Sequence, residues 1–252
     1  MKMERSEDIL ELLKQKKRMS VEELCAKFYC SPATMRRELN RLEAAGAIRR
    51  VRGGAVIRDG SNFDYSAHYR MSVNLEEKRS IASLAGDFLT DGQSLFLDSS
   101  STCEQLCSLI AMRRNMTVVT NGIYTSLLLN DSDTTDVYIL GGHIDRGSHT
   151  VLGEYAGGFA DNFRADIAFV SCRGVDCTGA SEAHPEQALV KRHMIQNAKA
   201  AILLADHTKF GKSYLHRLCN FSAFCAVITD IRPEEEICRS AAEVGCEVIW
   251  EG

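Results

Sequence analysis

Seven short apolar runs in the last two thirds of the chain constrain its fold more than any other feature. Helical patterns separate these runs, which are SLFL, TVVT, VYIL, DIAFV, AAILLA, FCAVIT and EVIW. Strands that alternate with helices favour a parallel sheet with both faces covered, because each crossover carries the chain back over the sheet. We therefore expect a Rossmann-like, mainly parallel α/β domain over residues 74–252, opening with a helix at about 74–89.

The first 58 residues predict a separate unit of three short helices and a hairpin. A first helix is expected at about 4–17. Ser20 and Glu23 then form the S-x-x-E pattern of a capping box, which opens a second helix. Ser31 is followed by proline at the first position of a third helix, which Gly46 ends. The polar, glycine-containing stretch 59–73 is expected to be a linker.

The third helix has one apolar face and one basic face. Met35, Leu39 and Leu42 fall within a narrow sector, so this side must pack against the rest of the unit. Small, amide and guanidinium side chains face away from it, as required of a helix that enters the major groove of DNA. The expected DNA contacts of this helix are Arg37, Asn40 and Arg41, with Thr34 beside them, Arg36 on the flank and Ser31 at the start.

Residues 48–57 predict a wing, with two short strands around a Gly-Gly turn. Arg49, Arg50 and Arg52 lie on this hairpin, where guanidinium groups can reach DNA phosphates or the minor groove. Such contacts add affinity that depends on salt rather than on base sequence.

Charge is divided unevenly along the chain. Residues 1–58 hold 14 Lys and Arg against 8 Asp and Glu, a net +6, and the remainder holds 16 against 26, a net −10. A basic segment joined to an acidic one indicates a polyanion partner for the N-terminal unit only. We therefore expect this winged helix-turn-helix domain, residues 1–58, to bind double-stranded DNA.

The N-terminal segment resembles the DNA-binding domain of DeoR-type bacterial regulators. Arg5, Ile9 and Leu13 match the start of the family pattern, and Ser31 with residues 34–39 match its end. Glu38 stands where the family usually has Asp, which keeps the charge. The alternative is a three-helix module that binds protein rather than DNA.

Polar residues follow several of the predicted strands, at the edge where parallel sheets bind ligands. SLFL is followed by a hydroxyl-rich turn suited to a phosphate, and Lys191 and Lys209 offer cations for an anion. The candidate effector residues are Asp98, Ser100, Ser101, Thr102, Asn121, Gly141, Gly142, Lys191 and Lys209.

Residues 74–252 also resemble the effector domain of the DeoR family. Its motifs occur in order as 98–102, 120–121, 141–142, 153–154, 191–192 and 206–211. The resemblance implies a fold shared with ribose-5-phosphate isomerase, binding of a phosphorylated sugar, and repression as the mode of control. Two departures concern the ligand: Ser100 and Ser101 replace the usual Gly and Thr, and Gln187 replaces a usual Glu.

The expected partners are thus an operator and a phosphorylated sugar, and paired half-sites predict a homo-oligomer. No cofactor, metal or catalytic residue is expected. The chain shows no signal peptide or membrane-spanning run, which predicts a cytoplasmic protein. Two alternatives stay open. One is redox sensing through Cys25 and Cys30. The other is an isomerase-like enzyme that draws acid and base groups from Asp98, Glu182, His184, Lys191 and Asp206.

Overall fold

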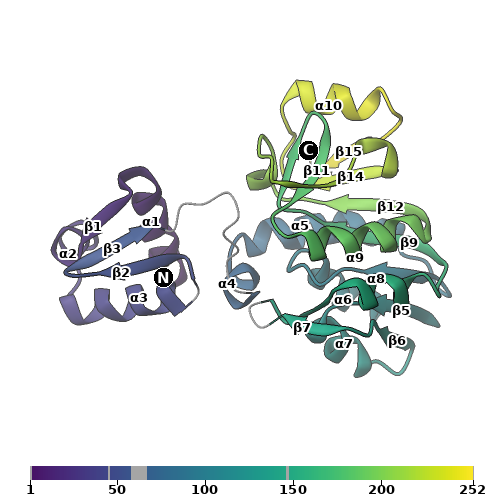
Figure 1. Ribbon diagram of the computed structural model, residues 1–252, viewed down its shortest axis with the longest axis horizontal. Coiled ribbons are helices and arrows are strands. Elements are labelled where there is room, and N and C mark those ends of the chain that lie inside the picture. The colour runs from purple at the N-terminus through teal and green to yellow at the C-terminus, as the bar shows by residue number, and fades with distance from the viewer. Residues whose placement is uncertain (1, 45, 58–66, 146–147, 252) are drawn as a thin grey trace. The chain divides into compact units, whose positions relative to one another are not determined.

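The computed structural model describes residues 2–44, 46–57, 67–145 and 148–251. They form two compact units, Met1–Val73 and Asn74–Gly252, which Figure 1 traces along its colour bar. Each unit has its own hydrophobic core and is described by itself. The predicted linker 59–73 lies partly outside the described residues, and its described part contains a short helix, α4 (Ala67–Ser72).

The N-terminal unit has the predicted three helices and hairpin, with one strand added. Its elements in order are α1 (Lys2–Lys16), β1 (Arg18–Ser20), α2 (Val21–Phe28), α3 (Pro32–Ala44), β2 (Ile48–Val51) and β3 (Gly54–Ile57). Strand β3 lies between β1 and β2 and pairs antiparallel with both. The core of this unit includes Ile9, Leu13, Leu24, Met35, Leu39 and Leu42.

Local signals place these elements as the sequence predicts, with one correction in the hairpin. Ser20 Oγ accepts a hydrogen bond from Glu23 N at 3.1 Å, and Ser20 N donates to Glu23 Oε2 at 2.7 Å, so the capping box is confirmed. The turn of the wing is Arg52-Gly53 rather than Gly-Gly, because Gly54 already pairs with Ser20 in β3. A Cβ at Gly54 would lie 2.2 Å from Met19 O, so only glycine fits this close approach.

The C-terminal unit is built on a seven-stranded sheet in which every pairing is parallel. All seven apolar runs of the sequence form its strands, which confirms the predicted fold class. They are β4 (Ser94–Leu97), β5 (Met116–Thr120), β6 (Thr135–Ile139), β9 (Ala165–Ser171), β12 (Ala198–Leu204), β14 (Ala226–Thr229) and β15 (Glu247–Trp250), in the spatial order β15-β14-β12-β9-β4-β5-β6.

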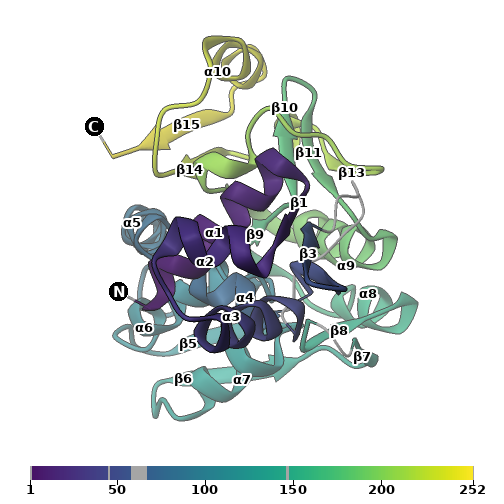
Figure 2. The same cartoon turned by 90° about the vertical axis from the view of Figure 1, so that its left-hand side faces the viewer.

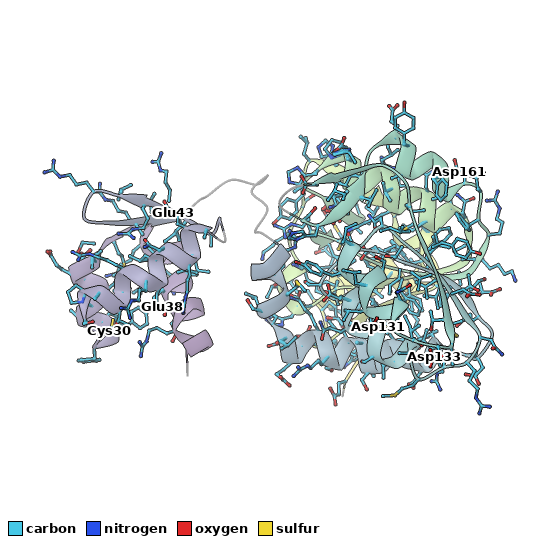
Figure 3. All side chains as sticks on the ribbon, turned by 90° about the horizontal axis from the view of Figure 1, so that it is seen from below. Cys30, Glu38, Glu43, Asp131, Asp133 and Asp161 are labelled. Carbon is cyan, nitrogen blue, oxygen red and sulfur yellow. The ribbon has the colours of Figure 1, made fainter. Side chains whose placement is uncertain are left out.

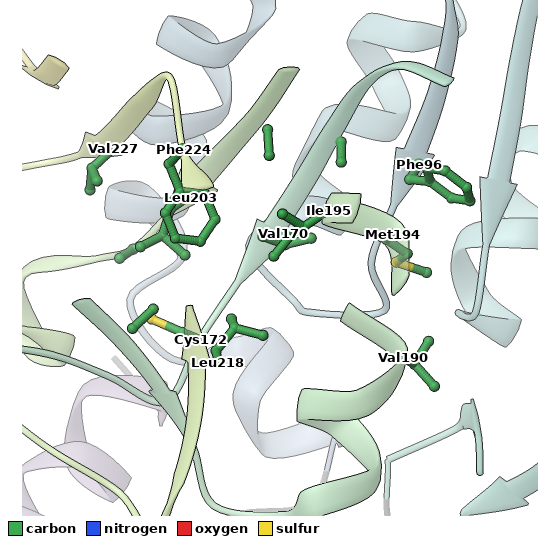
Figure 4. Close-up of a cluster of buried hydrophobic side chains, with 14 of the residues drawn as sticks. Phe96, Val170, Cys172, Val190, Met194, Ile195, Leu203, Leu218, Phe224 and Val227 are labelled. Carbon is green, nitrogen blue, oxygen red and sulfur yellow. The ribbon is translucent and has the colours of Figure 1, made fainter. Parts of the chain in front are cut away.

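Helices cover both faces of this sheet. One face packs against α5 (Leu75–Ala85), α6 (Cys107–Ile110) and α7 (Ile123–Asn130), and the other against α8 (Glu154–Ala160), α9 (Pro185–Gln196) and α10 (Glu235–Ala242). Alternate residues of β4 therefore enter different cores: Leu95 and Leu97 face α5, whereas Phe96 faces α8 and α9. Figure 4 shows Phe96, Val170 and Met194 in this second core. Short 3₁₀ helices are η1 (Gly86–Phe88), η2 (Cys103–Leu106), η3 (His207–Lys209) and η4 (Phe221–Ala223).

Two small antiparallel sheets were not predicted. One is the hairpin of β7 (His143–Asp145) and β8 (Thr150–Leu152), and the other joins β10 (Gly174–Asp176), β11 (Gly179–Glu182) and β13 (His216–Cys219). Figure 2 shows β10, β11 and β13 beside one another. These strands matter for the site because β8 carries Thr150 and β11 carries Glu182.

Candidate functional site

Helix α3 presents the basic face that the sequence predicts. Arg36 and Arg37 are exposed, while Met35, Leu39 and Leu42 are buried against the rest of the unit. Glu38, labelled in Figure 3, is also buried, which the sequence did not indicate, and its Oε1 lies 3.3 Å from Arg41 NH1. The exposed face of α3 is therefore cationic although the helix itself carries acids.

Hydroxyl groups secure the start of α3. Ser31 Oγ accepts a hydrogen bond from Thr34 N at 3.2 Å and lies 3.0 Å from Thr34 Oγ1. Ser31 thus acts as the N-cap that the sequence predicts. The structure brings Ser31 and Thr34 together at the exposed beginning of the helix.

The wing is attached to α3 through Arg50. Its guanidinium donates to Asn40 Oδ1, and its backbone N donates to Glu43 Oε1 at 2.7 Å. Arg49 and Arg52 are exposed on the same hairpin. Two of the predicted DNA contacts, Asn40 and Arg50, therefore bind each other across the gap between α3 and the wing, whereas Arg49 and Arg52 face solvent.

The second group of candidate residues lies at the carboxyl edge of the parallel sheet. Strand order reverses beside β4: β5 and β6 extend the sheet on one side, and β9 with the later strands extends it on the other. Parallel sheets bind ligands at such a switch point, outside the carboxyl ends of the strands. Asp98 follows β4 directly, and Asn121 follows β5.

Lys191 of α9 lies at this switch point in a buried ion cluster. Its Nζ is 3.1 Å from Asp98 Oδ2 and 2.5 Å from Glu182 Oε1, and it donates to Ser171 O at 2.8 Å. All three charged side chains are buried, with Lys191 only 5% exposed. The Lys191 ammonium is therefore already neutralised by protein carboxylates, an arrangement that the sequence did not indicate.

Electrostatics keep Asp98 and Lys191 ionised. Burial works to raise the pKa of Asp98, but the Lys191 ammonium and hydrogen bonds from Ser100 and Ser171 outweigh it and hold that pKa below its ordinary value. Burial likewise works to lower the pKa of Lys191, and the Asp98 and Glu182 carboxylates outweigh it, so this pKa lies above its ordinary value. Asp98 and Lys191 therefore each favour the charged form of the other.

The hydroxyl-rich turn after β4 is folded tightly around Asp98. Ser100 N donates to Asp98 Oδ1 at 2.8 Å, and Ser100 Oγ accepts from Cys103 N at 3.2 Å. Ser101 and Thr102 are buried. Within the described parts of the chain, no hydrogen bond from the backbone N–H of Ser101 or Thr102 is observed. The turn thus holds two backbone donors without a protein acceptor.

Asn121 ties the turn to the hairpin β7–β8. Its Oδ1 accepts from Ser99 N at 3.0 Å and its Nδ2 donates to Val151 O at 3.3 Å, while Thr150 Oγ1 donates to Ser99 Oγ at 2.8 Å. Gly141 and Gly142 follow β6 and are exposed. A Cβ at Gly142 would lie 2.6 Å from Leu152 O, so Gly142 allows β8 to approach the end of β6.

The loop after β12 adds a buried carboxylate to the same edge. Asp206 Oδ1 accepts from Thr208 N at 3.0 Å and from Asn74 Nδ2 at 3.3 Å. Asp206 Oδ2 is buried and has no hydrogen-bond partner among the described residues, although Lys209 Nζ lies 3.8 Å away. Burial works to raise the pKa of Asp206, and Lys209, Thr208 and Lys78 together hold it below its ordinary value.

Sequence reasoning missed Lys78 as a member of this edge. It lies on α5, is 4% exposed, and interacts electrostatically with both Asp206 and Glu104. In the sequence it belongs to the run Glu-Glu-Lys-Arg, which is typical of a solvated helix face. Only the packing of α5 against the sheet distinguishes it.

The described residues offer little support for redox or metal chemistry. Burial raises the pKa of the Cys25 thiol, and neighbouring Cys30 raises it further, so little reactive thiolate is present at neutral pH. Within the described ranges there is no group of three His, Cys, Asp or Glu that fits a metal ion. Among those same residues, no helix is both long and apolar enough to cross a membrane.

Comparison with known proteins connects both units to one family. Residues 5–60 match the DeoR-like helix-turn-helix domain, and residues 73–231 match the DeoR C-terminal sensor domain. The chain is 33% identical over 246 residues to the HTH-type transcriptional repressor GlcR of Bacillus subtilis, covering 98% of this chain and 95% of that protein. It is 31% identical over 231 residues to the glycerol-3-phosphate regulon repressor of Escherichia coli, covering 91% of each.

Among solved structures, part of the chain overlaps ribose-5-phosphate isomerase of Methanocaldococcus jannaschii. The overlap covers 54% of this chain and 55% of that one, at 17% identity and a TM-score of 0.41. Family assignment rests instead on the matches along the sequence, which include both units. The chain belongs to the DeoR family of helix-turn-helix transcriptional regulators.

Proposed function

We propose that this DeoR-family regulator is a repressor whose affinity for its operator is controlled by a phosphorylated sugar or a related small phosphorylated molecule. The observation that carries the DNA-binding part is the exposed cationic face of α3, flanked by the arginines of the wing. Its relatives GlcR and the glycerol-3-phosphate regulon repressor are named as repressors, which supports repression here and does not favour the isomerase-like alternative.

The unpaired backbone donors of the turn after β4 support a phosphate as the anchoring group of the effector. The amides of Ser101 and Thr102, the Ser100 hydroxyl and the Lys209 ammonium are donors of the kind that bind phosphate oxygens. Asn121, Gly141 and Gly142 complete the proposed site at the ends of β5 and β6. The name of the glycerol-3-phosphate regulon repressor supports a small phosphorylated polyol as the ligand class.

Lys191 has an indirect part in this proposal. Because its ammonium is paired with Asp98 and Glu182, it supports the effector site by fixing Asp98, around which the phosphate-binding turn folds. Lys209 is the more accessible cation, since its side chain is 21% exposed. We therefore assign the direct electrostatic contact to Lys209 and the positioning of the turn to Lys191.

Control of transcription requires the effector to prefer one of two arrangements of the protein. A ligand shifts such an equilibrium only through a difference in affinity between the two states. We propose a homo-oligomer that holds two half-sites in the bacterial cytoplasm and that the bound effector shifts away from the geometry of the operator. The reciprocal expectation is that operator DNA weakens effector binding by the same factor.

A thermal-shift comparison of phosphorylated sugars with their unphosphorylated counterparts tests the effector class. A ligand that binds only the folded state at 100 times its Kd stabilises that state by about 2.7 kcal/mol. The phosphorylated compounds should raise the melting temperature and release operator DNA, without being converted to another compound. If no phosphorylated compound shifts the melting temperature, the proposed ligand class is wrong.

Two lysines at opposite ends of β12 provide a matched pair of variants for this assay. Lys209 follows the carboxyl end, whereas Lys199 lies near the amino end with its side chain 80% exposed. Lys209→Ala should reduce the effector-induced shift, and Lys199→Ala should leave it unchanged. Equal responses of the two variants would contradict the placement of the effector at the carboxyl edge.

A further inference from the structure

Strand β6 is an edge of the seven-stranded sheet, and no described strand pairs with its outer side. Figures 1 and 2 both show it beside α7 at the end of the sheet opposite β15. On its inner side β6 pairs with β5 throughout, in the register Met116↔Thr135 to Thr120↔Ile139. An exposed edge strand is a template for pairing with another strand unless it is covered.

The backbone groups that face outward from β6 can be identified from its pairing with β5. Leu140 N donates to Thr120 O and Thr134 O accepts from Met116 N, so the even-numbered residues bond to β5. Alternate residues of a strand direct their N–H and C=O groups to opposite edges. The outward groups therefore belong to Thr135, Val137 and Ile139, for which the described residues show no other backbone partner.

Apolar side chains remain exposed on both sides of this edge. Tyr138 and Ile139 lie on β6, and Leu127 and Leu128 lie on the adjoining α7. Phe159 lies on α8, and its ring contacts the ring of Phe163, which in turn contacts the ring of Tyr138. These five exposed residues are called the β6 surface. Large exposed apolar side chains on elements that adjoin an unpaired strand favour an interaction site over an ordinary solvent-exposed face.

We infer that the β6 surface binds a second copy of this chain, with the two β6 strands pairing antiparallel about a two-fold axis at Val137. This inference deepens the homo-oligomer in the proposed function and rests on it. A two-fold axis at Val137 pairs Val137 with Val137 of the second copy and Thr135 with Ile139 of the second copy. Every outward backbone group of the three residues then finds an acceptor or a donor.

Charge favours this register over its neighbours. Asp136 is the one charged residue of β6, and the axis at Val137 places it opposite Tyr138 of the second copy. An axis at Asp136 would instead place two carboxylates opposite each other, and like charges in directly opposed positions destabilise a sheet. A parallel, in-register arrangement would also place Asp136 of one copy beside Asp136 of the other. It would bring Asp131 and Asp133 of the preceding loop, which Figure 3 labels, toward their counterparts as well.

Side chains of the flanking helices α7 and α8 would add to the contact between the two strands. Because Leu127 and Leu128 lie on α7, and Phe159 on α8, the two-fold axis would bring each helix of one copy toward the edge of the other. Apolar side chains would then be buried on both faces of the joined sheet. This fits a self-complementary, isologous interface, in which the same surface serves both copies.

Sedimentation equilibrium of the full chain, without DNA or effector, tests the inference. The wild-type chain should form dimers, or larger assemblies with an even number of copies. Leu128→Glu should raise the dimer Kd at least about tenfold, because it puts a charge into the apolar contact. Val244 is the matched control, since it is 50% exposed against 53% for Leu128 and precedes β15 at the other end of the sheet. Val244→Glu should leave the dimer Kd unchanged.

A second variant tests the backbone pairing without depending on side-chain polarity. Ile139→Pro removes an amide that faces outward and so breaks no bond to β5. Two hydrogen bonds would be lost per dimer, which predicts a Kd about tenfold to a hundredfold higher. The variant's circular dichroism should remain that of the wild type.

Hydrogen exchange gives an independent measurement of the register. The amides of Thr135, Val137 and Ile139 should exchange slowly at concentrations above the Kd and faster on dilution. Those of Asp136 and Tyr138 should be protected at both. The inference is overturned by a wild-type chain that stays monomeric, or by Leu128→Glu and Ile139→Pro chains that fold normally and keep the wild-type Kd.

These outcomes are separable from the proposed function. A chain that dimerises through β6 but ignores phosphorylated sugars would contradict the proposed effector and leave the interface standing. Conversely, a chain that releases DNA on binding a phosphorylated sugar while Leu128→Glu remains dimeric would keep the proposed function and overturn the interface.

Discussion

Replacing Lys191 with methionine should destabilise the C-terminal unit far more than an ordinary lysine substitution does. Methionine keeps much of the length and apolar volume of the lysine stem but removes the ammonium from between Asp98 and Glu182. Both carboxylates are buried, with exposed fractions of 0% and 3%, so neither regains hydration when its cation is lost. The variant therefore holds two buried charges without compensation.

The magnitude follows from measured costs of breaking buried ion pairs. Removal of one partner from such a pair costs about 3–5 kcal/mol, because an unpaired charge is left in the interior. For a domain of this size that corresponds to a fall in Tm of roughly 6–20 °C. The exposed pair Lys199–Asp166, at 2.7 Å, provides the control: Lys199→Met should change the free energy of unfolding by about 1 kcal/mol or less.

The expected effect depends on pH with a definite sign. The wild-type pKa of Asp98 is lowered, so its contribution to stability is present above its unfolded pKa, about 3.9, and is lost only as pH falls through the still lower folded pKa. Without the ammonium, burial raises the pKa of Asp98 above the unfolded value, and the folded variant gains stability by taking up a proton as pH falls. The difference between wild type and Lys191→Met should therefore be larger at pH 7.5 than at pH 5.

Urea unfolding followed by tryptophan fluorescence measures this difference selectively. Trp250 is the one tryptophan of the sequence and lies in β15, so its signal reports on the C-terminal unit. Adding Glu182→Gln to Lys191→Met should recover part of the lost stability, because one uncompensated carboxylate is removed. If Lys191→Met lost no more stability than Lys199→Met at pH 7.5, the reasoning from the buried cluster would be refuted.

Three further predictions concern the N-terminal unit. Arg37→Ala should weaken binding to an operator selected from random DNA by about 1–3 kcal/mol and relax specificity at one base pair. Fluorescence anisotropy measures both effects, and an unchanged affinity would contradict the placement of α3 in the groove. Arg52→Ala should lower the slope of log K against log salt by about 1, as expected of a side chain that contacts a phosphate, and an unaltered slope would argue against that contact. Ser20→Ala should cost about 1 kcal/mol of stability in urea unfolding followed by circular dichroism, because the capping box is lost, whereas Ser20→Thr should retain most of it.

The main sheet was predictable because its strands are buried on both faces. Runs such as Ser94–Leu97 are then apolar at consecutive positions, and they stand out between helical patterns. Strands β1 and β11 carry no such signal, since β1 reads Arg-Met-Ser and β11 reads Gly-Ala-Ser-Glu. Their pairing is set by the surrounding tertiary structure rather than by their own composition.

The sequence predicts where the candidate site lies, at the carboxyl edge of the sheet, but not which side chains contact each other there. Parallel topology brings the ends of β4, β5, β6 and β12 to one edge, so the residues after these strands could be chosen from the sequence. Which charges pair there depends on packing between elements far apart in the chain. The ion cluster of Lys191 with Asp98 and Glu182, and the burial of Lys78, are therefore found only in the structure.

The unpredicted strand β1 has a consequence for how the N-terminal unit reads DNA. Ser20 ends β1, where it pairs with Gly54 beside the turn of the wing, and it also caps α2. Arg50 links the wing to Asn40 and Glu43 of α3. The wing therefore cannot tilt independently of α3. With α3 in the groove and the wing on the DNA backbone, as proposed, this fixed spacing means that a DNA site with suitable bases but an unsuitable groove width must be deformed before both elements can bind it. The choice of operator would then depend also on the stiffness of base pairs that the protein does not contact.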